Sequence, residues 1–270
     1  MPVRNTFLQR LSKGWDALTG RVSSATRKSS FGTRQYASAQ GSRLSSGWGV
    51  SSTSADAELS SSLVTLRNRS RALCRDVSYA KRAKTLVVNN VIGSGIGMQA
   101  QVYTARDELN KRVNEDIEES WEEWCKADSC HTGGRFHFSS FERALMAQVF
   151  EAGEVLIRKH YRPFGKSGVP FALELIEAER LCDELTSPLT SVPAPNQVRM
   201  GVEVDAYFRP VAYLIRKRHP SELRFSAGET DQVERVPADQ IIHLVYGDRW
   251  PQTRGEPWLQ DRKSTRLNSS

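Results

Sequence analysis

The 270-residue sequence has few cysteines, and they are scattered along the chain. Such spacings do not form a disulfide framework, so a small disulfide-stapled protein is excluded and reduced thiols are expected. The chain also lacks both a run of about eighteen apolar residues and the apolar core of a secretory signal near its N-terminus. We therefore expect a soluble protein made in the cytosol. The four cysteines are Cys74, Cys125, Cys130 and Cys182.

No catalytic pattern is present in the sequence. There is no nucleophile motif such as GxSxG and no paired carboxylate site. His219 and His243 are isolated, and His243, inside an apolar strand, is predicted to be a structural histidine. Cys125, Cys130 and His131 offer three metal ligands, but no second CxxC or HxxxH pair completes a tetrahedral zinc site. We predict that the protein is not an enzyme and binds no metal and no cofactor.

The sequence IGSGIG, with Gly93, Gly95 and Gly97, superficially matches a dinucleotide-binding loop. Such a loop follows a strand and precedes a helix, whose N-terminal amides hold the pyrophosphate. Here the preceding segment has a helical pattern, and the following one, residues 98–103, has a strand pattern. The glycines are therefore predicted to end a helix and to form a tight turn.

The stretch from Asn114 to His160 has the clearest predicted structure, in the order helix, loop, helix and strand. The acids on the outer face of the first helix are interpreted as solvated, without a role in proton transfer. Ser139 and Glu142 predict a capping box for the second helix, Gly153 its left-handed end, and residues 154–161 a half-buried strand. The apolar stripe of the first helix comprises Leu109, Val113, Ile117, Trp121 and Trp124.

The rest of the chain predicts an α+β fold, with long helices and a mixed or antiparallel β-sheet. One long helix is predicted from Asp56 to the glycines. The second half is rich in β patterns, and residues 187–195, with three prolines, predict a loop. The predicted strands are residues 171–176, 198–204, 211–218, 233–236 and 240–246.

The net charge of +7 is concentrated in the first third of the chain. Residues 1–85 contain 15 Lys or Arg and 4 Asp or Glu, a balance of +11, so the remainder carries −4. Residues 1–54 are rich in Ser, Gly and Arg with isolated aromatics, which is typical of a mostly disordered arm that docks on another molecule. Such an arm binds nucleic acid or an acidic surface, and a merely hydrated tail is an equally good interpretation. The candidate contacts to DNA or a partner are Arg67, Arg69, Arg71, Arg75, Lys81, Arg82 and Lys84.

Several segments together resemble the phage portal proteins of the lambda type, over roughly residues 55–259. The last segment is the most specific, because its Arg-Val-Pro lead-in, its strand and its final QTRG-x-PWL occur together in that family. Phe208 stands where the family usually has glycine, and we expect it to select a different turn without changing function. The segments are RNRSRALCRDVSYAKRAKTLVVNNVIGSGIGMQAQV (67–102), IEESWEEW (117–124), EAGEVLIR (151–158), LELIEAERL (173–181), GVEVDAYFRPVAYLI (201–215) with His219-Pro220, and RVPADQIIHLVYGDRWPQTRGEPWL (235–259).

This resemblance implies the wing-type α+β body of a portal subunit. Portals form a ring of about twelve copies at one capsid vertex, through which a terminase motor pumps DNA and DNA later leaves. The implied partners are further copies of the chain, the terminase large subunit, capsid or scaffold and head-completion proteins, and double-stranded DNA, with no membrane. The implied location is the virion, and the host cytoplasm during assembly. Portals break no covalent bonds, which agrees with the lack of an active-site pattern.

The last residues, DRKSTRLNSS at 261–270, resemble the translation of a short-read sequencing adapter, and the family resemblance stops at Leu259. We expect residues 260–270 not to be native, and the natural frame to continue into stem, clip and crown regions. The alternative is a non-viral interaction module whose basic arm binds nucleic acid or a protein. Ring formation separates the two, because a binding module has no reason to close by head-to-tail contacts.

Overall fold

A computed structural model describes residues 52–187, 196–222 and 232–259. The chain divides after Ser51, and everything below concerns the unit that follows this residue. The predicted arm (1–54), most of the proline-rich loop and the adapter-like tail (260–270) therefore lie largely or wholly outside the described residues. Among the described helices, none is long and apolar enough to cross a membrane.

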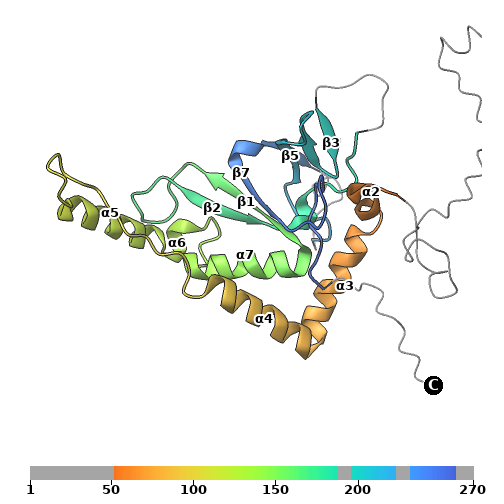
Figure 1. Cartoon of the computed structure of the whole chain (residues 1–270), viewed down its shortest axis with the longest axis horizontal. Helices are drawn as coiled ribbons and strands as arrows, with labels where there is room; N and C mark the ends of the chain where they lie inside the picture. The colour runs from red at the N-terminus through yellow and green to blue at the C-terminus, as the bar shows by residue number, and fades with distance from the viewer. Residues whose placement is uncertain (1–51, 188–195, 223–231, 260–270) are drawn as a thin grey trace, which may run out of the picture. The chain divides into compact units, whose positions relative to one another are not determined.

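Three helices, not one, lead from Ala55 to the glycines (Figure 1). They are α2 (Ala55–Ser60), α3 (Leu63–Asp76) and α4 (Ser78–Ile92). The prediction of a single helix is wrong because Val77 has an extended backbone, with φ −108° and ψ 116°, between α3 and α4. β-branched residues favour this conformation. The predicted helix stop is confirmed, since α4 ends at Gly93 with φ 56°.

The central unit contains α5 (Lys111–Trp124), α6 (Ala127–Cys130) and α7 (Phe138–Ala152). Leu109 lies outside α5, because the Asn110 side chain accepts a hydrogen bond from the Val113 amide and caps the helix there.

The predicted capping box of α7 is wrong. The N-cap is His137, whose Nδ1 accepts from the Ser139 amide, while the buried Glu142 accepts from the Ile96 amide at 3.2 Å. A long-range contact has therefore taken the carboxylate that a local cap would have used. Gly153 ends α7 in the left-handed conformation, with φ 82°, as predicted.

The strands form two antiparallel sheets, in the orders β2-β1-β7 and β3-β4-β5-β6. Residues 198–204 are not one strand, because they turn at Met200 and Gly201 into a hairpin of β3 and β4. Residues 98–103 form no strand beyond one bridge between Tyr103 and Leu109. The strands are β1 (Glu154–His160), β2 (Ala172–Ile176), β3 (Gln197–Arg199), β4 (Val202–Val204), β5 (Pro210–Arg216), β6 (Val233–Pro237) and β7 (Ile241–Val245).

Two hydrophobic cores lie on opposite sides of the first sheet, which confirms the α+β class. On one side Leu156 and its neighbours pack against Tyr213 and other residues of the second sheet. On the other side Ile157 packs with Phe141 of α7 and Trp124 of α5. The first four residues of β1 are therefore buried on both faces, so the predicted half-buried strand is correct in position and wrong in exposure.

We expected Phe208, which replaces the usual glycine, to select a different turn, but it keeps the backbone conformation of a glycine. Phe208 has φ 63°, the left-handed conformation that glycine favours, and its amide donates to the Asp205 carbonyl oxygen at 3.1 Å. The Asp205 carboxylate accepts from the amides of Tyr207 and Arg209. The Arg199 guanidinium lies 4.5 Å from the Phe208 ring centroid, a cation–π contact that offsets part of the backbone strain.

Candidate functional site

The most highly charged site is buried where α3, β1, β7 and the loop after β7 meet. Glu154, the first residue of β1, is wholly buried and lies beside Arg254. The guanidinium of Arg254 donates to both carboxylate oxygens of Glu154, at 2.6 and 3.0 Å. Arg67 adds a contact to Glu154 at 3.4 Å, and His243 adds one at 3.0 Å. We call Arg67, Glu154, Asp183, His243 and Arg254 the buried ion cluster.

Every charge in the buried ion cluster has a partner of opposite charge or a backbone partner. Arg67 lies 3.5 Å from Asp183, which also pairs with Arg254. Arg254 donates to the carbonyl oxygens of Met200 and Ala178, at 2.8 and 3.2 Å. The contact with Glu154 agrees with the prediction that His243 is a structural histidine. Removing one ion from such a cluster leaves another buried charge without compensation.

Electrostatics keeps the central carboxylate ionised. Burial alone would raise the pKa of Glu154, but the charge of Arg254 and the hydrogen bond from His243 outweigh burial and hold the pKa well below 4.5. Burial opposes the charge on Arg254, yet Glu154 and Asp183 raise its pKa above the usual value for arginine. Asp183 behaves differently, because burial raises its pKa above 3.8 despite both arginines. The arrangement holds the charges of Glu154 and Arg254 in place.

Two glycines allow the loop after β7 to reach the buried ion cluster. A Cβ atom on Gly153 would lie 2.2 Å from the carbonyl carbon of Glu256, and one on Gly255 would lie 2.2 Å from the Gly153 oxygen. The Gly255 amide donates to Glu154 at 3.0 Å. The Trp258 amide donates to the carbonyl oxygen of Phe150 at 3.1 Å. The segment RGEPWL is therefore fixed against the α7–β1 junction by backbone contacts that side chains would block.

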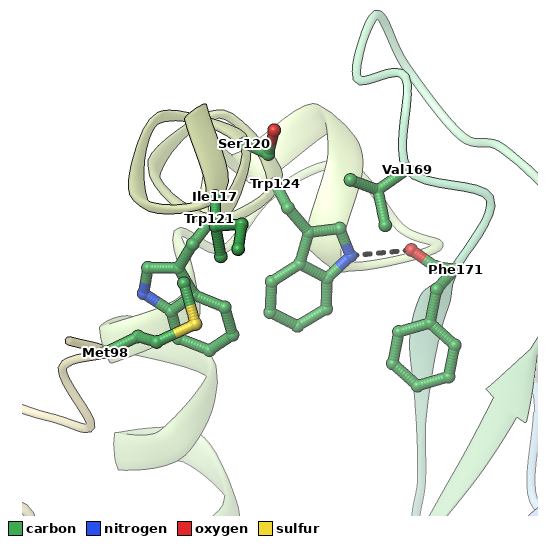
Figure 2. Close-up of a pocket in the computed structure, with 7 residues that line it drawn as sticks. All are labelled: Met98, Ile117, Ser120, Trp121, Trp124, Val169 and Phe171. Atoms are coloured by element: carbon green, nitrogen blue, oxygen red, sulfur yellow. Dashed lines mark hydrogen bonds between the residues drawn. The ribbon is translucent and has the colours of Figure 1, made fainter. Parts of the chain in front are cut away.

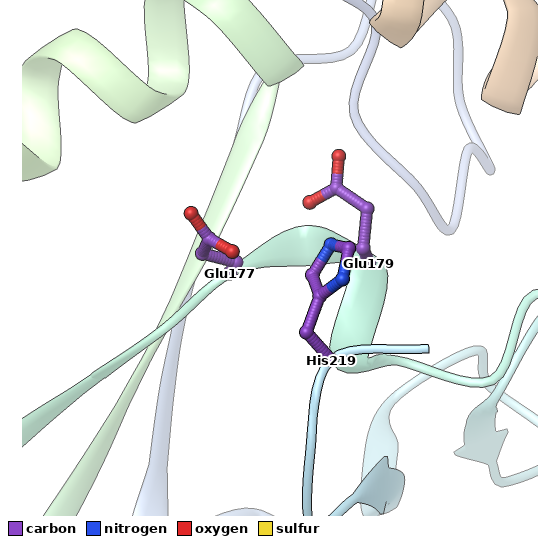
Figure 3. A group of neighbouring side chains, drawn as sticks. All are labelled: Glu177, Glu179 and His219. Atoms are coloured by element: carbon purple, nitrogen blue, oxygen red, sulfur yellow. The ribbon is translucent and has the colours of Figure 1, made fainter. Parts of the chain in front are cut away.

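A second group of side chains has the composition of a metal site. Glu177, Glu179 and His219 bring ligand atoms within 4.8 Å of one another (Figure 3). However, Arg71 already binds the Glu179 carboxylate at 2.6 Å. His219 Nδ1 accepts a hydrogen bond from the Ser221 amide at 3.1 Å, which places the proton of the neutral ring on Nε2. A protonated nitrogen is a donor to a carboxylate and not a metal ligand, so these residues fit an ion poorly.

The cysteines that resembled metal ligands are engaged inside the second core. Cys130 Sγ donates to the carbonyl oxygens of Cys125 and Phe136, at 3.6 and 3.3 Å. Burial raises the pKa of Cys130 to about 11, and burial also raises the pKa of Cys125. Burial lowers the pKa of the adjacent His131. The thiols therefore remain protonated at neutral pH, whereas zinc binds the thiolate.

The seven basic residues predicted to contact DNA or a partner divide into two groups. Arg67 is 1% exposed and belongs to the buried ion cluster. Arg71 and Lys84 are partly buried and pair with Glu179 and Glu151, each at 2.6 Å. These three residues hold α3 and α4 to the rest of the body. The exposed group, for which contact with DNA or a partner remains a prediction, comprises Arg69, Arg75, Lys81 and Arg82.

An apolar groove, which the sequence analysis did not predict, lies along α5 (Figure 2). Its volume is about 260 Å³. Trp124 forms its floor, 5% exposed, and donates from its indole nitrogen to the Phe171 carbonyl oxygen at 2.6 Å. Ile117 and Met98 at its rim are 37% and 38% exposed. The lining residues are Met98, Ile117, Ser120, Trp121, Trp124, Val169 and Phe171.

Comparison with known proteins agrees with the resemblance in the sequence. The profile described as phage portal protein, lambda family, matches residues 41–261. A probable portal protein of Halomonas phage phiHAP-1 is 32% identical over 261 residues, which cover 93% of this chain and 49% of that protein. The chain thus spans about half the length of this relative. A chain in the neck of an empty GTA particle, computed with C6 symmetry, has 13% identity and a TM-score of 0.38, covering 72% of this chain and 39% of that one. Because the profile covers most of its length, the chain belongs to the lambda family of phage portal proteins.

Proposed function

We propose that this chain is the wing-type body of a subunit that assembles into the head portal ring of a phage. The observation that carries the proposal is the family match over residues 41–261. The buried ion cluster supports it, because four of its five members come from three of the segments that carry the family resemblance. A body locked in this way suits a subunit that must keep its shape while DNA moves past it.

The assembled ring forms the channel through which DNA is packaged and ejected, and it docks the terminase large subunit. Its other partners are capsid or scaffold proteins and head-completion proteins, and its place is the virion, with assembly in the host cytoplasm. The subunit has no catalytic role of its own. Among the described residues, the carboxylates of the buried ion cluster are engaged by arginines, which is consistent with a structural protein.

The exposed cations on α3 and α4 are the contacts to DNA or to a neighbouring subunit. Arg69, Lys81 and Arg82 are exposed, and Arg75 pairs with its neighbour Asp76, at 2.9 Å on the surface. An exposed pair of this kind is weak enough to exchange for a phosphate.

The test is to read the source DNA across the codon for Leu259, to express the frame that it contains, and to measure the particle mass and symmetry by mass photometry and electron microscopy. A closed ring of about twelve copies is the expected result. A protein that stays monomeric, or that binds DNA without closing into a ring, would instead establish the interaction module.

A further inference from the structure

The flank of α5 beside Ser120 gives the apolar groove one acidic edge, where Glu123 also pairs with the exposed Lys126 at 3.6 Å. Six acids lie on α5, and five of them are exposed. At about 100° per residue, Asp116 and Glu123 lie on the flank of α5 beside Ser120, at the edge of the groove. Glu119 and Glu122 lie on the opposite side of the helix. An occupant that fits this surface carries apolar or aromatic side chains interspersed with positive charges.

The chain itself contains a segment of that chemistry. Residues 1–51 carry eight Lys or Arg and one Asp, a net charge of +7, which equals the net charge of the whole protein. Residues 52–270 are therefore neutral overall. Aromatic residues are spaced along the same basic segment, at Phe7, Trp15, Phe31, Tyr36 and Trp48. Aromatic rings between cations complement an apolar groove with an acidic edge.

The basic segment joins the body at the end remote from the groove. It leads into α2, where Asp56 accepts a hydrogen bond from the Thr253 amide at 2.8 Å and pairs with Arg199 of β3. The groove lies on α5, at the other end of the described body (Figure 1). In a ring closed by head-to-tail contacts, two different surfaces of the chain meet, so a segment that leaves one copy near α2 can bind a groove that lies elsewhere on its neighbour.

We infer that residues 1–51 of one copy bind the α5 groove of the neighbouring copy. This inference rests on the proposed function, because it takes the ring as the setting that brings the two ends together. The basic segment then acts as a clamp between successive subunits. Its aromatic side chains enter the groove beside Ile117 and Trp121, and its cations face Asp116 and Glu123.

The test is photo-crosslinking in a mixture of isotopically light and heavy full-length chains. A benzophenone amino acid replaces Ile117 in the groove, and a matched control carries it at Tyr79, which is 84% exposed on α4. We expect light-to-heavy cross-links from position 117 to peptides within residues 1–51, and none to that segment from position 79. Cross-links within one copy, cross-links to a different segment, or none at all would overturn the inference.

Charge reversal at the edge of the groove provides a second measurement. Asp116→Lys with Glu123→Lys is expected to reduce the cross-link yield about fivefold, because two attractive contacts become repulsive. Glu119→Lys with Glu122→Lys makes the same change in net charge on the far side of α5 and is expected to reduce the yield less than about twofold. Equal losses would show that only overall charge matters, which contradicts binding in the groove.

The particle mass, measured on the same samples, separates this inference from the proposed function. Rings that form without cross-links to residues 1–51 would overturn the inference alone. Cross-linked copies that do not close into a ring would overturn the proposed function and leave the contact between copies established.

Discussion

The buried ion cluster and the α5 groove differ in where they place charged and apolar side chains. The cluster brings charges into the interior and gives each of them partners, so Glu154 contacts Arg67, His243 and Arg254. The groove keeps aromatic and aliphatic side chains at the surface, where Ile117 remains 37% exposed. Buried charges are expensive unless fully paired, and exposed apolar grooves are costly unless they serve binding. The comparison assigns the cluster to holding the body together and the groove to contacting another chain.

The largest effect is expected when Arg254, the central cation of the buried ion cluster, is removed. Arg254→Ala leaves Glu154 buried beside weaker partners, so we expect the free energy of unfolding to fall by about 3–5 kcal/mol. Guanidinium unfolding followed by tryptophan fluorescence measures the change. Arg235→Ala is the matched control, because Arg235 is an exposed residue that pairs with Glu203 at 2.7 Å, so its loss should lower the free energy of unfolding far less. Similar losses for the two variants would refute the structural role of the cluster.

The next largest effect on the free energy of unfolding is expected at Gly153, where the loop after β7 passes close to the backbone. Gly153→Ala adds a Cβ atom 2.2 Å from Glu256 at a residue with φ 82°, so we expect a loss of about 3 kcal/mol in the same unfolding measurement. Gly134→Ala is the control, because its φ of 63° is also positive but the space around its Cβ position is open. That variant should lose only about 1 kcal/mol, from backbone strain alone. If both variants lost the same free energy of unfolding, the contact between Gly153 and Glu256 would not contribute to stability.

Acid should act on the buried ion cluster through its two carboxylates, Glu154 and Asp183, with opposite signs. The pKa of Glu154 in the folded protein lies below 4.5, so its stabilising contribution is present above pH 4.5 and is lost as the pH falls towards the folded pKa. Asp183 has the opposite sign, because its raised pKa makes the folded protein bind a proton more readily. Unfolding measured between pH 7 and pH 3 should therefore show less acid sensitivity for Glu154→Gln and more for Asp183→Asn. The reverse order of the two variants would contradict this assignment of pKa shifts.

The smallest expected effect on stability is at the rim of the groove. Ile117→Ser changes a partly exposed side chain, so the free energy of unfolding should change by only about 0.5 kcal/mol. Trp124→Ala, at the buried floor, should cost about 3–5 kcal/mol because it opens a cavity and frees the Phe171 carbonyl. The same chemical denaturation compares both. A large loss for Ile117→Ser would mean that the rim belongs to the core and is not free to bind a partner.

Local patterns in the sequence predicted local structure well. Ser139 and Gly153 predicted the two ends of α7 within a residue or two, although Ser139 is not its N-cap. The strands β2, β5, β6 and β7 also lie close to their predicted ranges, because hydrophobic runs bounded by turn residues determine them. Trp124 is a core residue, as its place on the apolar stripe predicted.

Long-range contacts explain what the sequence did not predict. Glu142 had the spacing of a capping residue, but the Ile96 amide, 46 positions away, uses its carboxylate. Val77 interrupts a continuous helical pattern so that both α3 and α4 can pack against α7. The buried ion cluster joins residues up to 187 positions apart, and no local rule identifies such partners. Arg67 was accordingly placed with the surface cations, although it is 1% exposed.

The position of Arg254 also sets the timing of folding during synthesis. Ribosomes add about 5–20 residues per second, so Arg254 is made about 10–40 s after Arg67. In the later part of that interval, once Glu154 has been added, Arg67 and Glu154 are present in the nascent chain without the arginine that compensates the carboxylate most closely. The body therefore completes its folding only when the segment RGEPWL has emerged. A nascent chain that has not reached this segment therefore lacks the ion pairs by which Arg254 joins the loop after β7 to Glu154 and Asp183.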